Sequence, residues 1–156
     1  MIALKLVRLI ETHHEQLAHS LIRKLEESSK CTTLKDIVPQ QEIEMRVEEV
    51  YRHLSDWLLT RTEHDIFVAY TALGKHRFQQ EVPFQQFLWG IMLVKENLWD
   101  FLEGESVEVS AMNLHGEFEL LRMLDQFFDK ALYYAALGYW EAHEFEERER
   151  KLAHVS

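Results

Sequence analysis

Apolar residues recur at three- and four-residue steps along most of the chain, which is the period of an amphipathic helix. In residues 2–25 the apolar stripe consists of Ile2, Leu6, Ile10, Leu17, Leu21 and Leu25. In residues 41–60 it consists of Ile43, Val47, Val50, Leu54, Trp57 and Leu58. These segments predict the first two helices. The intervening residues 28–41 contain Pro39 and predict a connection with room for one short turn around residues 34–38.

Capping signals place the next two helices. Thr62 can cap a third helix, with Asp65 three residues on in the position of a capping-box acid. This helix should run through Ile66, Tyr70 and Leu73 towards Phe78. Pro83 suits the first position of a fourth helix, where its missing N–H would be unbonded in any case, and Gly104 can end that helix.

A long last helix is predicted over about residues 113–147, after an acidic link over residues 103–110. Ser110 or Asn113 can cap it. Its stripe consists of Leu114, Phe118, Leu121, Leu124, Phe128, Leu132 and Ala135. Alternating strand patterns and hairpin signals are missing from the sequence. The fold class is therefore all-α: one domain over residues 1–156, a bundle of about five helices that a globin-like arrangement would also satisfy.

Charge and composition limit the classes of molecule that this chain can be expected to bind. The chain has 156 residues, 47% of them hydrophobic, and a formal net charge of −10, which repels phosphate backbones and anionic lipid surfaces. Cys31 is the only cysteine, so an internal disulfide is excluded. Lys5 and Arg8 interrupt the apolar N-terminus, and no apolar run is long enough to span a bilayer. We expect a soluble, cytoplasmic protein that binds no nucleic acid and does not insert into membranes.

Nine histidines raise the question of a metal or haem. Glu11 and His14 form one Glu-x-x-His motif, whereas a di-iron centre needs two such motifs and further glutamates. The sequence therefore predicts no metal site. Haem stays an alternative, because His53, His76 or His115 could supply an axial ligand, but no motif indicates it and no cofactor is expected.

Catalytic motifs are also missing, whereas aromatic residues are in surplus. There is no Gly-x-Ser-x-Gly elbow and no glycine-rich phosphate loop, so we do not expect an enzyme. The aromatic residues exceed what five stripes require: Trp89 falls outside its stripe, and of the adjacent Tyr133 and Tyr134 at least one must face away from the core. Such surplus apolar surface is typical of a contact site or a ligand cavity. The candidate ligand or interaction residues are Trp57, Tyr70, His76, Arg77, Trp89, Trp99, Tyr133 and Tyr134.

Three segments carry a resemblance to a known family. They are Leu73-Gly-Lys-His-Arg77, then Val82-Pro83-Phe84, then Leu98-Trp-Asp-Phe-Leu102. Their order and spacing resemble the N-terminal domain of RsbT co-antagonist (RsbRD-type) proteins. The last helix, with Phe127-Phe128, Ala131, Tyr133-Tyr134 and Gly138-Tyr139, is similar to the helix that joins such domains to an output module, so the resemblance covers about residues 2–140.

The resemblance implies an all-helical sensor domain that forms a homodimer. Such domains relay stress or ligand signals to a kinase or an anti-sigma-antagonist domain, and no catalytic residues come with them. In the family an output domain usually follows, whereas this sequence stops at Ser156. The expected function is therefore a non-catalytic sensor or regulatory interaction domain of bacterial signal transduction, with a haem-binding or small-ligand-binding globin-like sensor as the alternative.

Overall fold

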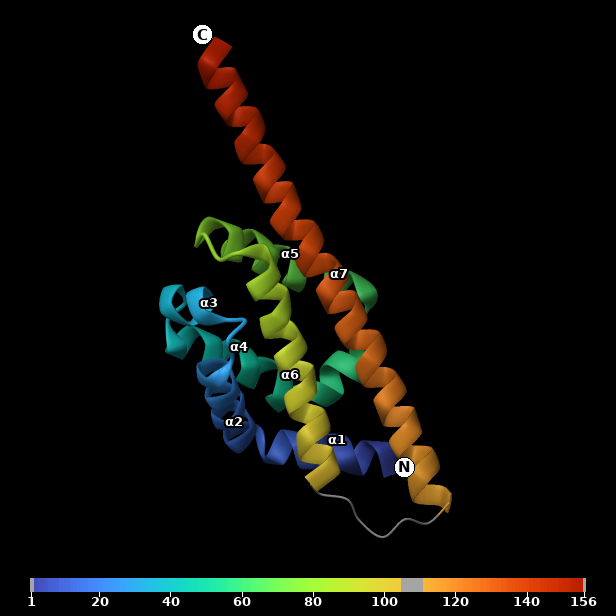
Figure 1. Ribbon diagram of the computed structural model, residues 1–156. Coiled ribbons are helices and arrows are strands. Elements are labelled where there is room, and N and C mark those ends of the chain that lie inside the picture. The colour runs from blue at the N-terminus through green and yellow to red at the C-terminus, as the bar shows by residue number, and fades with distance from the viewer. Residues whose placement is uncertain (1, 105–110, 156) are drawn as a thin grey trace.

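The computed structural model confirms the all-α prediction (Figure 1). It describes the backbone of residues 2–104 and 111–155 and, within them, all side chains except those of residues 2, 3, 111–115 and 117. No strand occurs in this described part of the chain. The helices are α1 (Ile2–Thr12), α2 (His14–Glu27), α3 (Thr32–Ile37), α4 (Gln40–Arg52), the π-helix η1 (Asp56–Thr60), α5 (Glu63–Gln79), α6 (Phe84–Gly104) and α7 (Ala111–Val155).

The first predicted helix is divided at His13, which is a correction to the continuous helix expected over residues 2–25. The backbone at His13 departs from helical geometry, with φ −101° and ψ 22°, and α1 then lies across the base of the bundle while α2 turns upward (Figure 1). Two side chains bond back to carbonyls of the preceding turn: Thr12 Oγ1 donates to Arg8 O at 2.8 Å, and His13 Nδ1 lies 2.8 Å from Leu9 O. Such local bonds compete with helix continuation.

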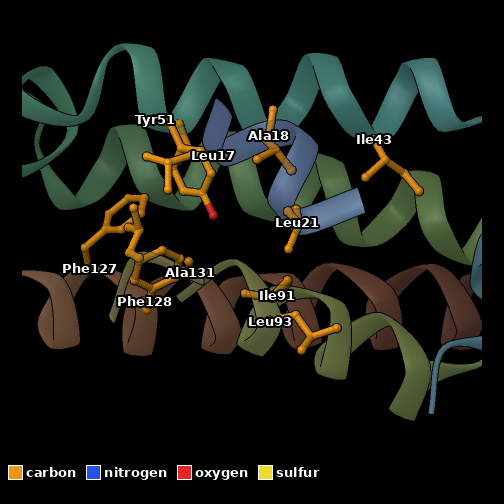
Figure 2. Close-up of a cluster of buried hydrophobic side chains, with 14 of the residues drawn as sticks. Leu17, Ala18, Leu21, Ile43, Tyr51, Ile91, Leu93, Phe127, Phe128 and Ala131 are labelled. Carbon is orange, nitrogen blue, oxygen red and sulfur yellow. The ribbon is translucent and has the colours of Figure 1, made fainter. Parts of the chain in front are cut away.

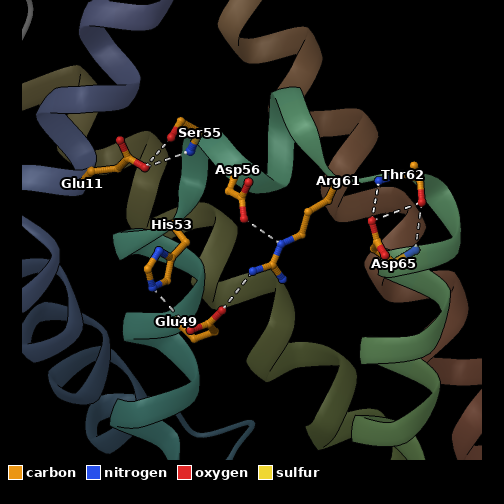
Figure 3. Close-up of polar contacts among 8 residues, drawn as sticks. All are labelled: Glu11, Glu49, His53, Ser55, Asp56, Arg61, Thr62 and Asp65. Atoms are coloured by element: carbon orange, nitrogen blue, oxygen red, sulfur yellow. Dashed lines mark hydrogen bonds and ion pairs between the residues drawn. The ribbon is translucent and has the colours of Figure 1, made fainter.

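The second predicted helix is divided as well. α4 ends at Arg52, and the chain continues through His53 into the π-helical turn η1. The Glu11 carboxylate of α1 accepts hydrogen bonds from Ser55 N (3.0 Å) and Ser55 Oγ (2.8 Å), just before η1 (Figure 3). A side chain distant in sequence therefore stabilises this irregular segment. The short turn expected around residues 34–38 is present as α3.

The start of α5 confirms the capping-box prediction. Thr62 N donates to Asp65 Oδ2 at 2.8 Å and Asp65 N donates to Thr62 Oγ1 at 3.3 Å, so two otherwise unbonded N–H groups are satisfied (Figure 3). Pro83 lies one residue before the first helical residue of α6, where its carbonyl accepts from Phe87 N at 3.0 Å. Gly104 ends α6, as predicted.

The last helix is longer than predicted. α7 covers 45 residues, or about 68 Å at 1.5 Å per residue, instead of residues 113–147. It begins at Ala111, so Asn113 lies inside the helix and is not its cap, while Ser110 and most of the expected acidic link lie outside the described residues. α7 follows α5 and then continues past the bundle as an isolated helix (Figure 1).

The core fills the space between α2, α4, α6 and α7 (Figure 2). Among its fully buried side chains are Leu21, Tyr51, Leu98 and Phe128. A buried polar network crosses it: Asn97 Nδ2 donates to Leu17 O (2.9 Å) and to Tyr51 Oη (3.1 Å), and Tyr51 Oη donates to Val94 O (2.8 Å). These bonds join α2, α4 and α6 at one level of the bundle. No described helix combines the length and the apolarity that crossing a bilayer requires.

Candidate functional site

The seam between α4 and α5 is loosely packed, and a partly buried ion pair closes one of its ends. α4 and α5 contact each other only sparsely, whereas α5 and α7 pack along their whole shared length. Glu42 Oε1 of α4 accepts from Arg77 Nη1 at 2.7 Å and lies 2.8 Å from His76 Nε2. Gln80 joins both partners, since its Oε1 accepts from Arg77 Nη1 and its Nε2 donates to Glu42 Oε2. Two sequence candidates, His76 and Arg77, therefore meet at one carboxylate.

The charges of this pair are set by competing effects. Burial alone would raise the pKa of the Glu42 carboxyl, but hydrogen bonds and charge from Arg77, with hydrogen bonds from His76 and Gln80, leave that pKa below its ordinary value. Burial lowers the pKa of the Arg77 guanidinium and Glu42 opposes the change. An arginine nevertheless stays protonated at neutral pH. The positive charge of Arg77 is thus already matched by Glu42.

A second polar cluster closes the other end of the seam (Figure 3). Arg61 Nε donates to Asp56 Oδ2 at 3.0 Å, and Arg61 Nη2 lies 3.4 Å from Glu49 Oε1 of α4. The guanidinium carbon of Arg61 lies 3.8 Å from the ring centroid of Trp57, a cation–π contact. Asp56 and Glu49 therefore hold the Arg61 guanidinium over the ring of Trp57.

Between these two ends a cavity of about 390 Å³ opens into the core. Its walls are mainly aliphatic and aromatic side chains, including Leu25, Ile43, Val50, Leu73, Ile91 and Phe128. Exposed residues of α4 border it, among them Met45 and Glu49. Ligand cavities commonly measure about 300–1,000 Å³ and are lined in this way, with few polar groups.

Two sequence candidates, Trp57 and Tyr70, line this cavity with unpaired polar groups. Trp57 is 5% exposed, and its Nε1 has no hydrogen-bond partner. Tyr70 is 8% exposed, and its hydroxyl bonds to no described residue. Their rings meet edge to face at 6.0 Å, and Phe127 contacts both. Burial raises the pKa of the Tyr70 hydroxyl, against the weaker effect of Arg46 and Arg61, so the hydroxyl stays protonated and can donate.

Trp57 lies in a π-helical turn, which is a second feature that marks this position. Trp57 is the second residue of η1, whose five residues close with a bond from Arg61 N to Asp56 O at 2.8 Å. π-Helical turns are rare and frequently occur at functional sites. The wider turn places Trp57 in the core between Tyr70 and Phe127.

The remaining aromatic candidates lie elsewhere and do not form one site. Trp89 is half-buried, and Lys30 Nζ lies 3.9 Å from its ring centroid. Trp99 is also half-buried, with an unpaired Nε1. Tyr133 is exposed and Tyr134 packs on Phe67 at 5.4 Å, which confirms that one of the two tyrosines faces away from the core. Arg77, Trp57 and Tyr70 share the cavity, whereas Trp89, Trp99, Tyr133 and Tyr134 do not line it.

The histidines of the described residues do not gather into a cluster that could hold a metal ion. No group of three or more His, Cys, Asp or Glu suitable for a metal occurs among the residues searched. The two halves of the Glu-x-x-His motif diverge, since Glu11 bonds to Ser55 and His14 lies 3.4 Å from Glu48. His53 pairs with Glu49 on the surface, and the His115 side chain lies outside the described residues.

The crossing of α5 and α7 is unusually close. An added Cβ at Gly74 would lie 2.1 Å from Ala135 O, and one at Gly138 would lie 2.1 Å from Thr71 O. Glycine at both positions is therefore required for the two backbones to approach this closely. The two glycines are 64 residues apart in the chain, and a single sequence carries no signal that residues so far apart lie where two helices cross.

A stripe on α7 is buried along the bundle and exposed beyond it. Phe128, Ala131, Ala135 and Gly138 are buried. The same alternation of three- and four-residue steps continues through Ala142, Phe145, Glu149 and Leu152. Phe145 is 64% exposed and Leu152 is 66% exposed. Phe145 and Leu152 are therefore large apolar side chains of this stripe that the bundle does not cover.

Comparisons with known proteins identify no relative. No protein-family model matches the chain, and neither a curated protein nor a solved structure matches it. The resemblance to RsbRD-type domains therefore stays a prediction from the sequence.

Proposed function

We propose that the chain is a non-catalytic regulatory domain that acts by helix packing and self-association, as a sensor or relay in bacterial signal transduction. Its RsbRD-like segments support this role. So does the long α7, which packs in the bundle with one half and projects from it with the other (Figure 1). The signalling partner would be a kinase or an anti-sigma-antagonist domain, as the resemblance implies.

The observation that carries the proposal is the continuing stripe on α7. Residues repeating at alternating three- and four-residue steps form the contact seam of a two-stranded coiled coil. Up to Gly138 this seam is buried by the bundle, Ala142 is half-buried, and from Phe145 to Leu152 the seam is exposed. A second copy of the same helix would cover Phe145 and Leu152 with their own counterparts, with Glu149 as a polar interruption of the seam. The projecting ends would then form a homodimer.

The experiment compares two identical substitutions on the same helix. Phe145→Glu places a charge in the seam, whereas Phe118→Glu changes a phenylalanine of almost equal exposure, 63% against 64%, on the first part of α7. Sedimentation equilibrium over a wide concentration range should give a dimer for the wild type and Phe118→Glu, and a dissociation constant raised by about tenfold or more for Phe145→Glu. A wild type that stays monomeric at every concentration, or equal constants for both variants, would refute self-association through this seam.

The cavity favours a second candidate function, that of a small-ligand sensor. It is lined by residues of six α-helices, α2 to α7, and of η1, including Phe128 of α7. Its lining includes no histidine, so the described residues offer haem no imidazole ligand there. The chemistry of the cavity favours a different class of ligand.

A further inference from the structure

We infer that the cavity between α4 and α5 binds a small, uncharged, mainly apolar molecule whose one oxygen acceptor, such as a carbonyl, receives a hydrogen bond from the Tyr70 hydroxyl. This inference deepens the sensing part of the proposed function and depends on that proposal only for its biological role. Binding itself is measured separately from self-association.

The unpaired donors are the first argument. A buried donor without an acceptor is costly, and each such group in a native structure calls for an explanation. Both Trp57 and Tyr70 line the same cavity: Trp57 Nε1 is fully buried without a partner, and Tyr70, 8% exposed, has a hydroxyl that bonds to no described residue. An indole N–H can only donate, and a protonated phenol hydroxyl donates as well. The missing partner is therefore an acceptor, and a ligand oxygen in the cavity would supply it.

The surrounding charges decide that this acceptor is neutral. Two arginines line the cavity: Arg77 is buried and matched by Glu42 at 2.7 Å, whereas Arg46 is 45% exposed and lies 3.9 Å from the same carboxylate. Arg61, beyond the other end of the cavity, is matched by Asp56 and Glu49. A carboxylate bound among these apolar side chains would lose its hydration at a large cost, because the one buried cation of the cavity lining, Arg77, is already matched by Glu42. A carbonyl, ether or alcohol oxygen avoids that cost and still accepts one hydrogen bond.

Size and access set the remaining properties of the ligand. The cavity of about 390 Å³ is between two and three times the roughly 150 Å³ of an apolar cavity that holds benzene, so it suits a two-ring aromatic or an aliphatic chain of similar size. The opening lies where α4 and α5 contact each other sparsely, between the Glu42 and Arg61 clusters. Met45 borders this opening, and a flexible thioether side chain can adjust to different shapes.

The test uses prodan, a naphthyl ketone whose emission reports both an apolar environment and a hydrogen bond to its carbonyl. Wild-type protein should bind prodan with a blue-shifted emission. 2-Acetylnaphthalene should displace it about tenfold better than 2-ethylnaphthalene, which has almost the same shape but lacks the oxygen. The absence of saturable binding, or equal competition by the two compounds, would overturn the inference.

Two variants then assign the contacts, and a third serves as a matched control. Tyr70→Phe should abolish the preference for 2-acetylnaphthalene and leave 2-ethylnaphthalene binding unchanged. Tyr51→Phe removes another buried hydroxyl, one that bonds to Val94 O and does not line the cavity, so it should alter neither affinity. Gly90→Leu puts a side chain into the cavity, because its Cβ meets Leu34 Cδ1 at an ordinary 3.4 Å, and should remove the binding of both compounds.

The outcomes separate the inference from the proposed function. Full retention of the preference by Tyr70→Phe refutes the assigned donor, even if Gly90→Leu fails to fold. Unchanged binding in a folded Gly90→Leu variant refutes the site. The monomeric Phe145→Glu variant should bind both compounds as the wild type does, so failed dimerisation leaves the ligand test intact.

Discussion

The close crossing of α5 and α7 makes a specific prediction about Gly74 and Gly138. Alanine at either position would place its Cβ 2.1 Å from a backbone carbonyl oxygen of the other helix, where ordinary contacts begin at 3.4 Å. Neither backbone carbonyl can rotate away as a flexible side chain would. The two helices must therefore separate locally by more than about 1 Å.

The expected magnitude combines a cost and a gain. Overpacking a close-packed interior typically costs about 1–3 kcal/mol, and contact with a rigid backbone belongs at the upper end of that range. Replacing glycine by alanine inside a helix recovers about 1 kcal/mol of helix propensity. The free energy of unfolding of each variant should therefore fall by about 2 kcal/mol, which lowers the melting temperature of a domain this size by about 4–8 °C. The double variant should lose less than twice that amount, because both alanines force the same separation.

Two other glycines provide matched controls in the same protein. A Cβ at Gly104 meets nothing within 4 Å, and one at Gly90 meets only the end of the Leu34 side chain at 3.4 Å. Thermal unfolding followed by circular dichroism should show Gly90→Ala and Gly104→Ala melting at or slightly above the wild-type temperature. If Gly74→Ala and Gly138→Ala have the same melting temperature as these controls, the helices do not cross this closely and the reasoning is wrong.

Two further predictions concern buried polar groups. Glu42→Gln should lower the free energy of unfolding by about 1–3 kcal/mol at pH 7, because the buried Arg77 loses its anionic partner while the amide still accepts a hydrogen bond. Because the folded-state pKa of Glu42 lies below its ordinary 4.5, the stability difference between wild type and Glu42→Gln should be complete above pH 4.5. The difference should shrink as the pH falls through the lower folded-state pKa. Urea titrations at several pH values measure it, and a difference independent of pH would contradict the prediction. Tyr51→Phe should lower the free energy of unfolding by about 1–2 kcal/mol in the same titration at pH 7, because Asn97 Nδ2 loses an acceptor. Tyr70→Phe should lower it by less. The reverse order would contradict the assigned bonds.

The periodicity of the sequence was enough to predict the fold class, because each helix needs one apolar face and shows it locally. The same locality explains the correct capping box at Thr62 and Asp65, which are three residues apart. The helix breaks at His13 and His53 were missed, although the stripe over residues 2–25 has a gap between Ile10 and Leu17 that signalled the first break. The second break depends on Glu11, which lies 44 residues from Ser55 in sequence.

The candidate site could be predicted only in part, for the same reason. Trp57, Tyr70 and Arg77 are among the predicted ligand or interaction residues, and the structure brings them to one cavity. Glu42, which matches the charge of Arg77, had no signal in the sequence, since the pairing of residues 35 positions apart follows from how α4 and α5 pack. Trp89, chosen because it falls outside its stripe, is half-buried beneath Lys30.

The cavity and the projecting helix are joined physically, because α7 contributes to both. Phe128 lines the cavity, and the stripe that begins there passes the glycine crossing and continues to Leu152. A ligand can influence self-association only if it binds one arrangement of α7 more tightly than another. Linkage then requires dimerisation to change ligand affinity by the same factor. The crossing at which Gly74 faces the backbone of Ala135 and Gly138 faces that of Thr71 is where such a shift would be transmitted. A backbone contact without side chains between the helices cannot absorb a displacement of α7 by side-chain rearrangement.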